Sequence, residues 1–122
     1  MAKISRDRGL RFEREIVNLL KALGVQAERV PLSGSMKGNY SADLRIGPDL
    51  STSAECKIRK RAWQDLYDAI AQDNADLLFI RKDRAEPLVV LPWTTWVQVI
   101  TALGWTDPAR ATLILPHKEI EK

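Results

Sequence analysis

The 122-residue sequence contains only one cysteine, Cys56, and only one histidine, His117. A single cysteine cannot form an internal disulfide, so the fold needs no oxidising compartment. His117 has no Cys or His partner nearby in the chain, so neither a zinc site nor a Ser-His catalytic system is supported. No apolar run approaches the ~18 residues that span a bilayer. We therefore expect a cytoplasmic protein that makes no membrane contact.

The residues that are present indicate one globular domain, residues 1–122. Hydrophobic residues make up 45% of the chain, which is enough for one packed core. No repeat, low-complexity segment or long Ser/Gly/Pro linker divides it. Nineteen Lys and Arg against 16 Asp and Glu give a net charge of +3. Such a small excess of positive charge is only a weak indication of an anionic partner. Whether the protein binds a polyanion depends on where the charges are placed along the chain.

Hydrophobic periodicity predicts an alternation of helices and strands that is typical of an α/β fold. Ser5 and Gly24 are expected to cap the first helix. The Gly- and Ser-rich segment 32–42 is expected to form a loop. The predicted helices are 5–23, 62–72 and 93–103, and the predicted strands are 25–31, 43–46, 53–59, 77–80, 88–91 and, near the C-terminus, 111–115. The continuous apolar runs at 77–80 and 88–91 are typical of strands buried in a sheet.

Three charged residues on the predicted hairpin 43–59 have the pattern of a hydrolytic metal site. Asp43 on the first strand and Glu55 on the second can share one face and bind a hard divalent cation. Lys57, two residues further along, points to the same side. Phosphodiester cleavage needs oxygen ligands for Mg²⁺, an activated water and a positive charge near phosphorus. Glu13 on the first helix is a candidate for a fourth acidic contributor.

A simpler interpretation is that Glu55, Lys57 and Arg59 form the solvated face of an edge strand. A Glu-x-Lys motif alone is common by chance. The metal-site interpretation therefore depends on the other residues around Glu55 and Lys57. Cys56 falls between the two site residues on the apolar face, and we interpret it as a packed thiol rather than a nucleophile.

Three segments, in order, resemble the PD-(D/E)xK nuclease superfamily and, within it, the archaeal-type Holliday junction resolvases. RGLRFEREIVNLLKALG resembles the first helix of that family, VPLSGSMKGNYSADL resembles its serine-glycine loop, and AECK resembles its E-x-K strand. The resemblance covers residues 6–92, with Ala42 where the superfamily pattern has proline.

The resemblance implies a restriction-endonuclease-like core, in which helices flank a central mixed sheet. It implies a metal site in which Asp43, Glu55 and the backbone carbonyl of Cys56 bind Mg²⁺ or Mn²⁺, with Glu13 contributing. It makes Lys57 the catalytic lysine and places Ser35 near the scissile phosphate.

Basic residues cluster in the sequence around each proposed acid, as phosphate contacts require. Any one of them alone is more simply a solvated charge, and the clustering is what favours DNA binding. The predicted DNA-binding residues are Arg8, Arg11, Ser35, Lys37, Arg59, Lys60 and Arg61.

The sequence therefore predicts a metal-dependent, structure-specific DNA endonuclease that makes paired nicks in four-way junctions, encoded by a cell or a phage. Two alternatives stay open: a flap, fork or linear-duplex nuclease of the same superfamily, and a catalytically silent nuclease fold that only binds DNA. The segment 93–122 carries many apolar residues, including Trp93, Trp96, Val97 and Ile100. We interpret it as a C-terminal helix and tail that offer a homodimer surface, because two symmetry-related cuts suit two identical sites.

Overall fold

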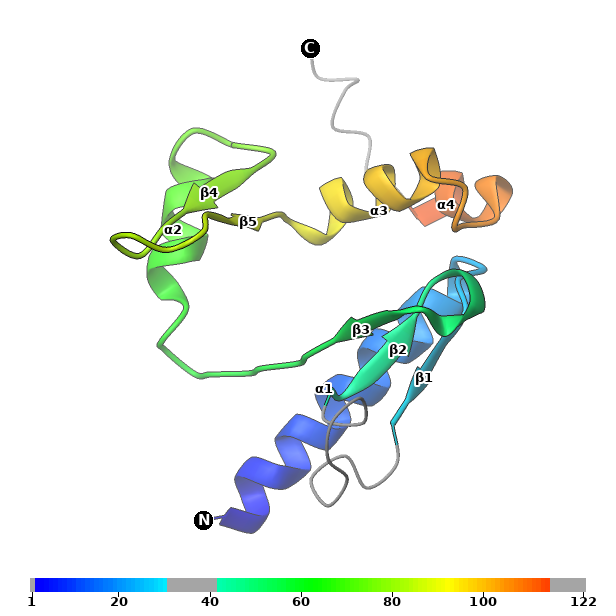
Figure 1. Ribbon diagram of the computed structural model, residues 1–122, viewed down its shortest axis with the longest axis horizontal. Helices are drawn as coiled ribbons and strands as arrows, with labels where there is room; N and C mark the ends of the chain where they lie inside the picture. Colours follow the sequence, from blue (N-terminus) through cyan, green and yellow to red (C-terminus); the bar gives the residue numbers. More distant parts are fainter. Residues whose placement is uncertain (1, 31–41, 115–122) are drawn as a thin grey trace.

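The computed structural model describes residues 2–30 and 42–114 (Figure 1). Its elements, in chain order, are α1 (Ala2–Ala22), β1 (Ala27–Arg29), β2 (Leu44–Ile46), the short 3₁₀ helix η3 (Pro48–Leu50), β3 (Thr52–Ala54), α2 (Gln64–Gln72), β4 (Leu78–Ile80), β5 (Leu88–Val90), α3 (Trp93–Ala102) and α4 (Pro108–Ile114). The predicted α/β class is confirmed. No helix in the described part of the chain is long and apolar enough to cross a membrane.

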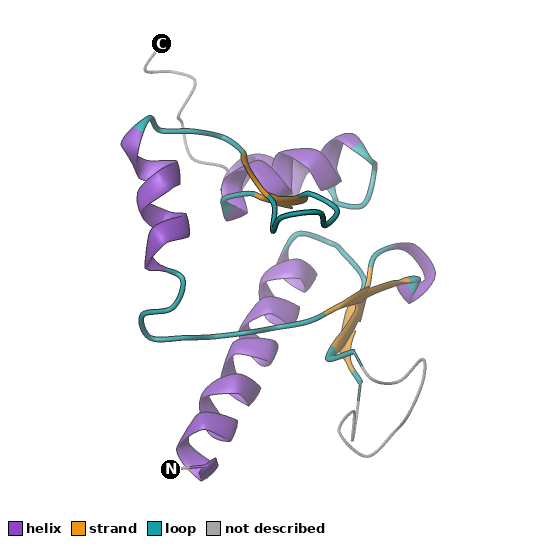
Figure 2. Ribbon diagram, turned by 60° about the vertical axis from the view of Figure 1, so that its left-hand side comes forward, coloured by secondary structure: helices purple, strands orange, loops and turns teal. Residues whose placement is uncertain are grey.

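The described strands form two small antiparallel sheets, where one mixed sheet was expected. Strands β1, β2 and β3 form the first sheet in that order, and β4 pairs with β5 in the second. Neighbours in each sheet are consecutive along the chain, and every pairing is antiparallel. Between the sheets, the long loop that leads from β3 to α2 runs without pairing to a strand (Figure 2).

The core lies between α1, the first sheet and the two C-terminal helices. It is a cluster of buried aliphatic side chains from all of these elements: Val17, Leu20, Leu23, Val25, Ala27, Leu44, Ile46, Val97, Ile100 and Ala111. Trp93, Trp96 and Trp105 pack against this cluster. We interpreted the apolar stripe of α3 as a homodimer surface. Much of this stripe packs into the core of the same chain instead, because Val97 and Ile100 are buried in the core cluster.

The end of α1 is set by Gly24, as the sequence predicted. Gly24 has a φ of +86°. The Val25 N–H donates to the Leu20 carbonyl at 2.9 Å and the Gly24 N–H donates to the Lys21 carbonyl at 2.9 Å, which is the Schellman pattern. The Asp107 N–H then donates to the Leu23 carbonyl at 2.8 Å, so the turn before α4 docks directly on this helix end.

Gly24→Ala is expected to lower the free energy of unfolding by roughly 1–3 kcal/mol, the range for strained backbone and overpacking. An added Cβ would lie 2.9 Å from both the Cβ and the backbone N of Asp107. Gly104→Ala is the matched control, because Gly104 has a φ of +82° but nothing within 4 Å of its Cβ position. Urea unfolding should show the larger loss for Gly24→Ala; equal losses would mean that the docked turn tolerates the methyl group.

Three local predictions were wrong. Ser5 does not cap α1, because the helix begins at Ala2. Residues 111–115 were predicted as a strand, but α4 covers Pro108–Ile114. The missed signal is Asp107 before Pro108: the Asp107 carboxylate accepts from the Ala109 N–H at 3.2 Å, and proline favours the first helical turn.

The third error concerns the apolar runs that were expected to be buried. The side chains of Phe79 on β4 and of Leu88 and Val89 on β5 are exposed. Periodicity cannot reveal this, because it shows that a segment is apolar but not what covers it.

Candidate active site

A cleft of about 560 Å³ contains all four predicted catalytic residues. Glu13 comes from α1, Asp43 from the position just before β2, and Glu55 and Lys57 from the chain just after β3. The cleft thus joins segments more than forty positions apart in the chain.

The β2–β3 hairpin explains why Asp43 lies beside the Glu55 segment. Leu44 pairs with Ala54, so the antiparallel register brings the next residues, Asp43 and Glu55, to the same end of the hairpin. The Cys56 N–H donates a hydrogen bond of 2.9 Å to Asp43 Oδ2. The aspartate is therefore attached to the segment that carries the E-x-K motif.

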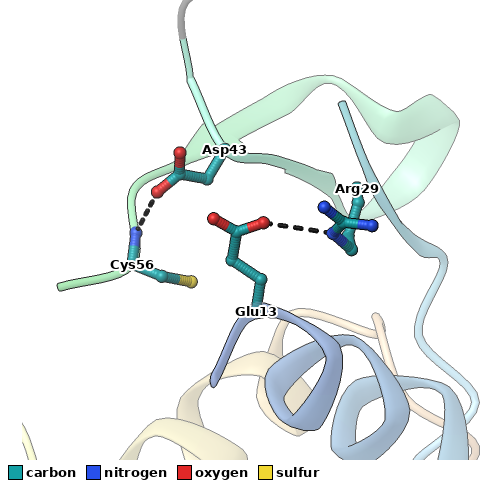
Figure 3. Close-up of polar contacts among 4 residues, drawn as sticks. All are labelled: Glu13, Arg29, Asp43 and Cys56. Atoms are coloured by element: carbon teal, nitrogen blue, oxygen red, sulfur yellow. Dashed lines mark hydrogen bonds and ion pairs between the residues drawn. The ribbon is translucent and has the colours of Figure 1, made fainter. Parts of the chain in front are cut away.

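Glu13 reaches the site from α1 (Figure 3). Its side chain rises between Arg29 on one side and Asp43 and Cys56 on the other. Arg29 Nε donates to Glu13 Oε1 at 3.1 Å, and the Glu13 side chain is only 15% exposed. Arg29 was not among the predicted site residues. A signal existed, since Arg29 continues the inward alternation of Val25 and Ala27, where a charged residue needs a partner.

Glu55 and Lys57 lie at the open side of the cleft. Lys57 Nζ is 3.9 Å from Glu55 Oε2, and their side chains are 60% and 53% exposed. A contact of this kind contributes little to stability. In the described part of the chain, no three Asp, Glu, His or Cys side chains are close enough together to hold one metal ion.

The thiol of Cys56 is partly buried and lies within the electrostatic influence of three carboxylates. Its pKa is raised to about 11, first by burial and then by the negative charges of Asp43, Glu13 and Glu55. The thiol is therefore neutral at physiological pH, which agrees with our interpretation that Cys56 is not a nucleophile. Cys56 also packs against the hydrophobic core.

The predicted DNA-binding residues are only partly brought together. Arg8, Arg59 and Lys60 line the cleft, together with Arg6. Arg11 lies on another surface of α1, beside Arg14, and Arg61 is exposed but is not part of the cleft lining. Ser35 and Lys37 lie outside the described residues.

A helix glutamate, a hairpin aspartate and an E-x-K pair in one basic-rimmed cleft are the arrangement expected of a nuclease of the restriction-endonuclease-like class. The model of the family described as archaeal Holliday junction resolvase (Hjc) matches residues 4–102. The chain belongs to this family, and it is a Holliday junction resolvase by that membership. The match extends through α3, which the resemblance found in the sequence, residues 6–92, did not include.

No curated protein and no solved structure matches the chain. Membership of this family shows that the protein is a nuclease that acts on branched DNA. It identifies neither the metal nor the role of any one residue.

Proposed function

We propose that the protein is a Mg²⁺-dependent endonuclease that cuts two strands of a four-way DNA junction as a homodimer inside the cell. One observation carries this proposal: Glu13, Asp43, Glu55 and Lys57 line a single cleft. The same cleft has a rim of basic side chains, Arg6, Arg8, Arg59 and Lys60, which suits a polyanion.

The cleft offers donor groups of the chemical type that a hard divalent cation binds, and an ion would have to draw them together, because no three of the described side chains lie close enough to hold it as they stand. Three carboxylates and a backbone carbonyl are oxygen ligands, which Mg²⁺ and Mn²⁺ prefer. We propose that Asp43, Glu55 and the Cys56 carbonyl hold the ion and that Glu13 contributes from α1. When bound, the ion lowers the pKa of water and polarises the phosphate.

The chain's own residues would prepare this site in three ways. The Cys56 N–H holds Asp43 at 2.9 Å and so orients its carboxylate. Arg29 neutralises part of the negative charge of Glu13. Lys57 can leave its weak, exposed contact with Glu55 to stabilise the charge that develops on the phosphate.

A second copy is required by the geometry of the reaction. The described residues provide one such acidic cleft, and a junction is resolved by two symmetry-related cuts. Two copies related by a twofold axis supply two sites at matching positions.

A substrate panel tests this function. Protein and Mg²⁺ are incubated with a four-way junction, a flap and a linear duplex of matched sequence. We expect paired, symmetric nicks in the junction alone. Equal cutting of the linear duplex would contradict resolution, and junction binding without cutting in either Mg²⁺ or Mn²⁺ would indicate a silent nuclease fold.

A further inference from the structure

A second large hollow lies beside α2, and it shares no lining residue with the acidic cleft. Its volume is about 520 Å³. It is lined from the side of α2 by Trp63, Leu66, Tyr67 and Ile70, and from the end of β5 and the start of α3 by residues 90–93. We call this hollow the aromatic groove. Every described side chain that lines it is apolar or aromatic, so the groove carries no charged group of its own.

Two aromatic rings in this groove are accessible to solvent. Tyr67 is 72% exposed and Trp63 is 39% exposed. Trp63 is the N-cap residue of α2, and Tyr67 lies four positions further on, so both rings belong to one face of the helix. An aromatic ring with a free face can stack on any nucleobase. Contacts of this kind are independent of sequence, as a structure-specific nuclease requires.

A basic segment joins the acidic cleft to the aromatic groove. Residues 55–60 line the cleft and Trp63 lines the groove, so only Arg61 and Ala62 separate the two along the chain. Arg59, Lys60 and Arg61 are all exposed. Figures 1 and 2 show this segment as the connection that leads from β3 to α2. A DNA strand held in the cleft can therefore follow these phosphate-binding side chains to the groove.

The acidic residues of α2 do not oppose this path. Asp65 and Asp68 do not line the aromatic groove. With 3.6 residues per turn, they project from the side of α2 away from Trp63 and Tyr67. The groove thus combines apolar walls with a basic approach, which suits a base on a polyanionic backbone.

We propose that the aromatic groove binds a nucleobase unstacked at the branch point of the junction, with Tyr67 and Trp63 stacking on the base and Arg61 at its phosphate. Base stacking is interrupted where strands cross between arms, so a base there costs less to unstack than a base inside a duplex. This inference rests on the proposed function and names how the branch point is recognised.

The charge beside the groove favours DNA over a second copy of the chain as its occupant. In a twofold contact the same surface of both copies meets, so the basic segments of the two copies would approach each other. Like charges oppose such an approach, whereas a phosphate backbone neutralises them.

Tyr67→Ala tests the groove, because this exposed ring can be removed with little effect on packing. In EDTA, we expect the dissociation constant for a four-way junction to rise roughly 10-fold, as the loss of one stacked base predicts. The constant for a linear duplex of matched sequence should stay within about twofold, because the phosphate contacts remain. Tyr67→Phe keeps the ring and should bind the junction as tightly as wild type.

Leu103→Ala is the matched control, since Leu103 is 63% exposed at the end of α3 and does not line the groove. It should change neither dissociation constant. Arg61→Ala should lower the salt dependence of junction binding, whereas Tyr67→Ala should leave it unchanged.

A junction with 2-aminopurine at the branch point reports stacking directly. We expect its fluorescence to change when wild type or Tyr67→Phe binds, and to change much less with saturating Tyr67→Ala. Equal loss of junction and duplex affinity, unchanged affinity of Tyr67→Ala, or the same fluorescence with both proteins would each overturn the proposal. Sedimentation that shows a dimer weakened by Tyr67→Ala would assign the groove to a second copy and overturn it as well.

These outcomes are separate from the fate of the proposed function, because binding is measured without cleavage. Junction cleavage by a wild type whose affinity does not depend on Tyr67 would overturn the base-binding groove and leave the nuclease assignment intact. Junction binding that depends on Tyr67, without cleavage in Mg²⁺ or Mn²⁺, would support the groove and contradict the proposed function.

Discussion

Asp43→Asn is expected to abolish metal-dependent junction cleavage, with a loss of at least about a thousandfold, or about 4 kcal/mol of transition-state stabilisation. The substitution removes one negative charge from the cleft that Glu13 and Glu55 also line. It conserves the shape of the side chain, and the amide oxygen can still accept the hydrogen bond from the Cys56 N–H. The loss should therefore come from the metal site rather than from the fold.

Calorimetry and DNA binding separate these causes for Asp43→Asn. We expect weaker Mg²⁺ binding by titration calorimetry, a thermal midpoint close to wild type, and junction binding in EDTA that is at least as tight. Asp65→Asn is the matched control, because Asp65 is an exposed aspartate in the first turn of α2, outside the cleft. Cleavage by Asp43→Asn at the wild-type rate would show that Asp43 is not part of the active site.

Lys57→Ala is expected to slow cleavage by roughly 100-fold or more at saturating Mg²⁺, while junction binding changes little. The reason is that one positive charge beside the phosphate stabilises the transition state more than the bound substrate. The side chain is 60% exposed and its ion pair with Glu55 is at 3.9 Å, so its loss should leave the thermal midpoint unchanged.

The control for Lys57→Ala is Lys21→Ala, which removes an exposed lysine from the last turn of α1, away from the cleft. Single-turnover rates measured with saturating protein isolate the chemical step from binding. Lys57→Arg should recover part of the rate if charge is what matters. A Lys57→Ala rate equal to wild type would favour the simpler interpretation of an edge strand with a solvated charged face.

The candidate site could be predicted in part because its central residues are local in the chain. Asp43 and Glu55 flank one hairpin, and the pairing of Leu44 with Ala54 is enough to bring them together. Glu13 was proposed from its place on the first helix, and the resemblance to the resolvase family supported it; its partner Arg29 is sixteen positions away. The hydrogen bond from the Cys56 N–H to Asp43 needs no contact beyond the hairpin.

Long-range packing decided the other features of the site, which are the contact between Glu13 and Arg29 and the choice of arginines that line the cleft. The side chains of Arg29 and Glu13 meet only because α1 packs against β1. Arg8 and Arg11 are equally basic and close in sequence, but the turn of the helix places Arg8 in the cleft and Arg11 outside it. Charge clustering along the chain could not make that distinction.

The sequence by itself determined the α/β class, the first helix with its Gly24 end, the β2–β3 hairpin and the order of the proposed catalytic residues. Each of these depends on local periodicity, turn chemistry or short-range pairing. The tertiary structure alone decided that the apolar side chains of α3 fill the core of the chain while Phe79 and Val89 remain exposed. Both segments are apolar, and burial depends on which surfaces meet in space, which no local pattern of hydrophobicity records.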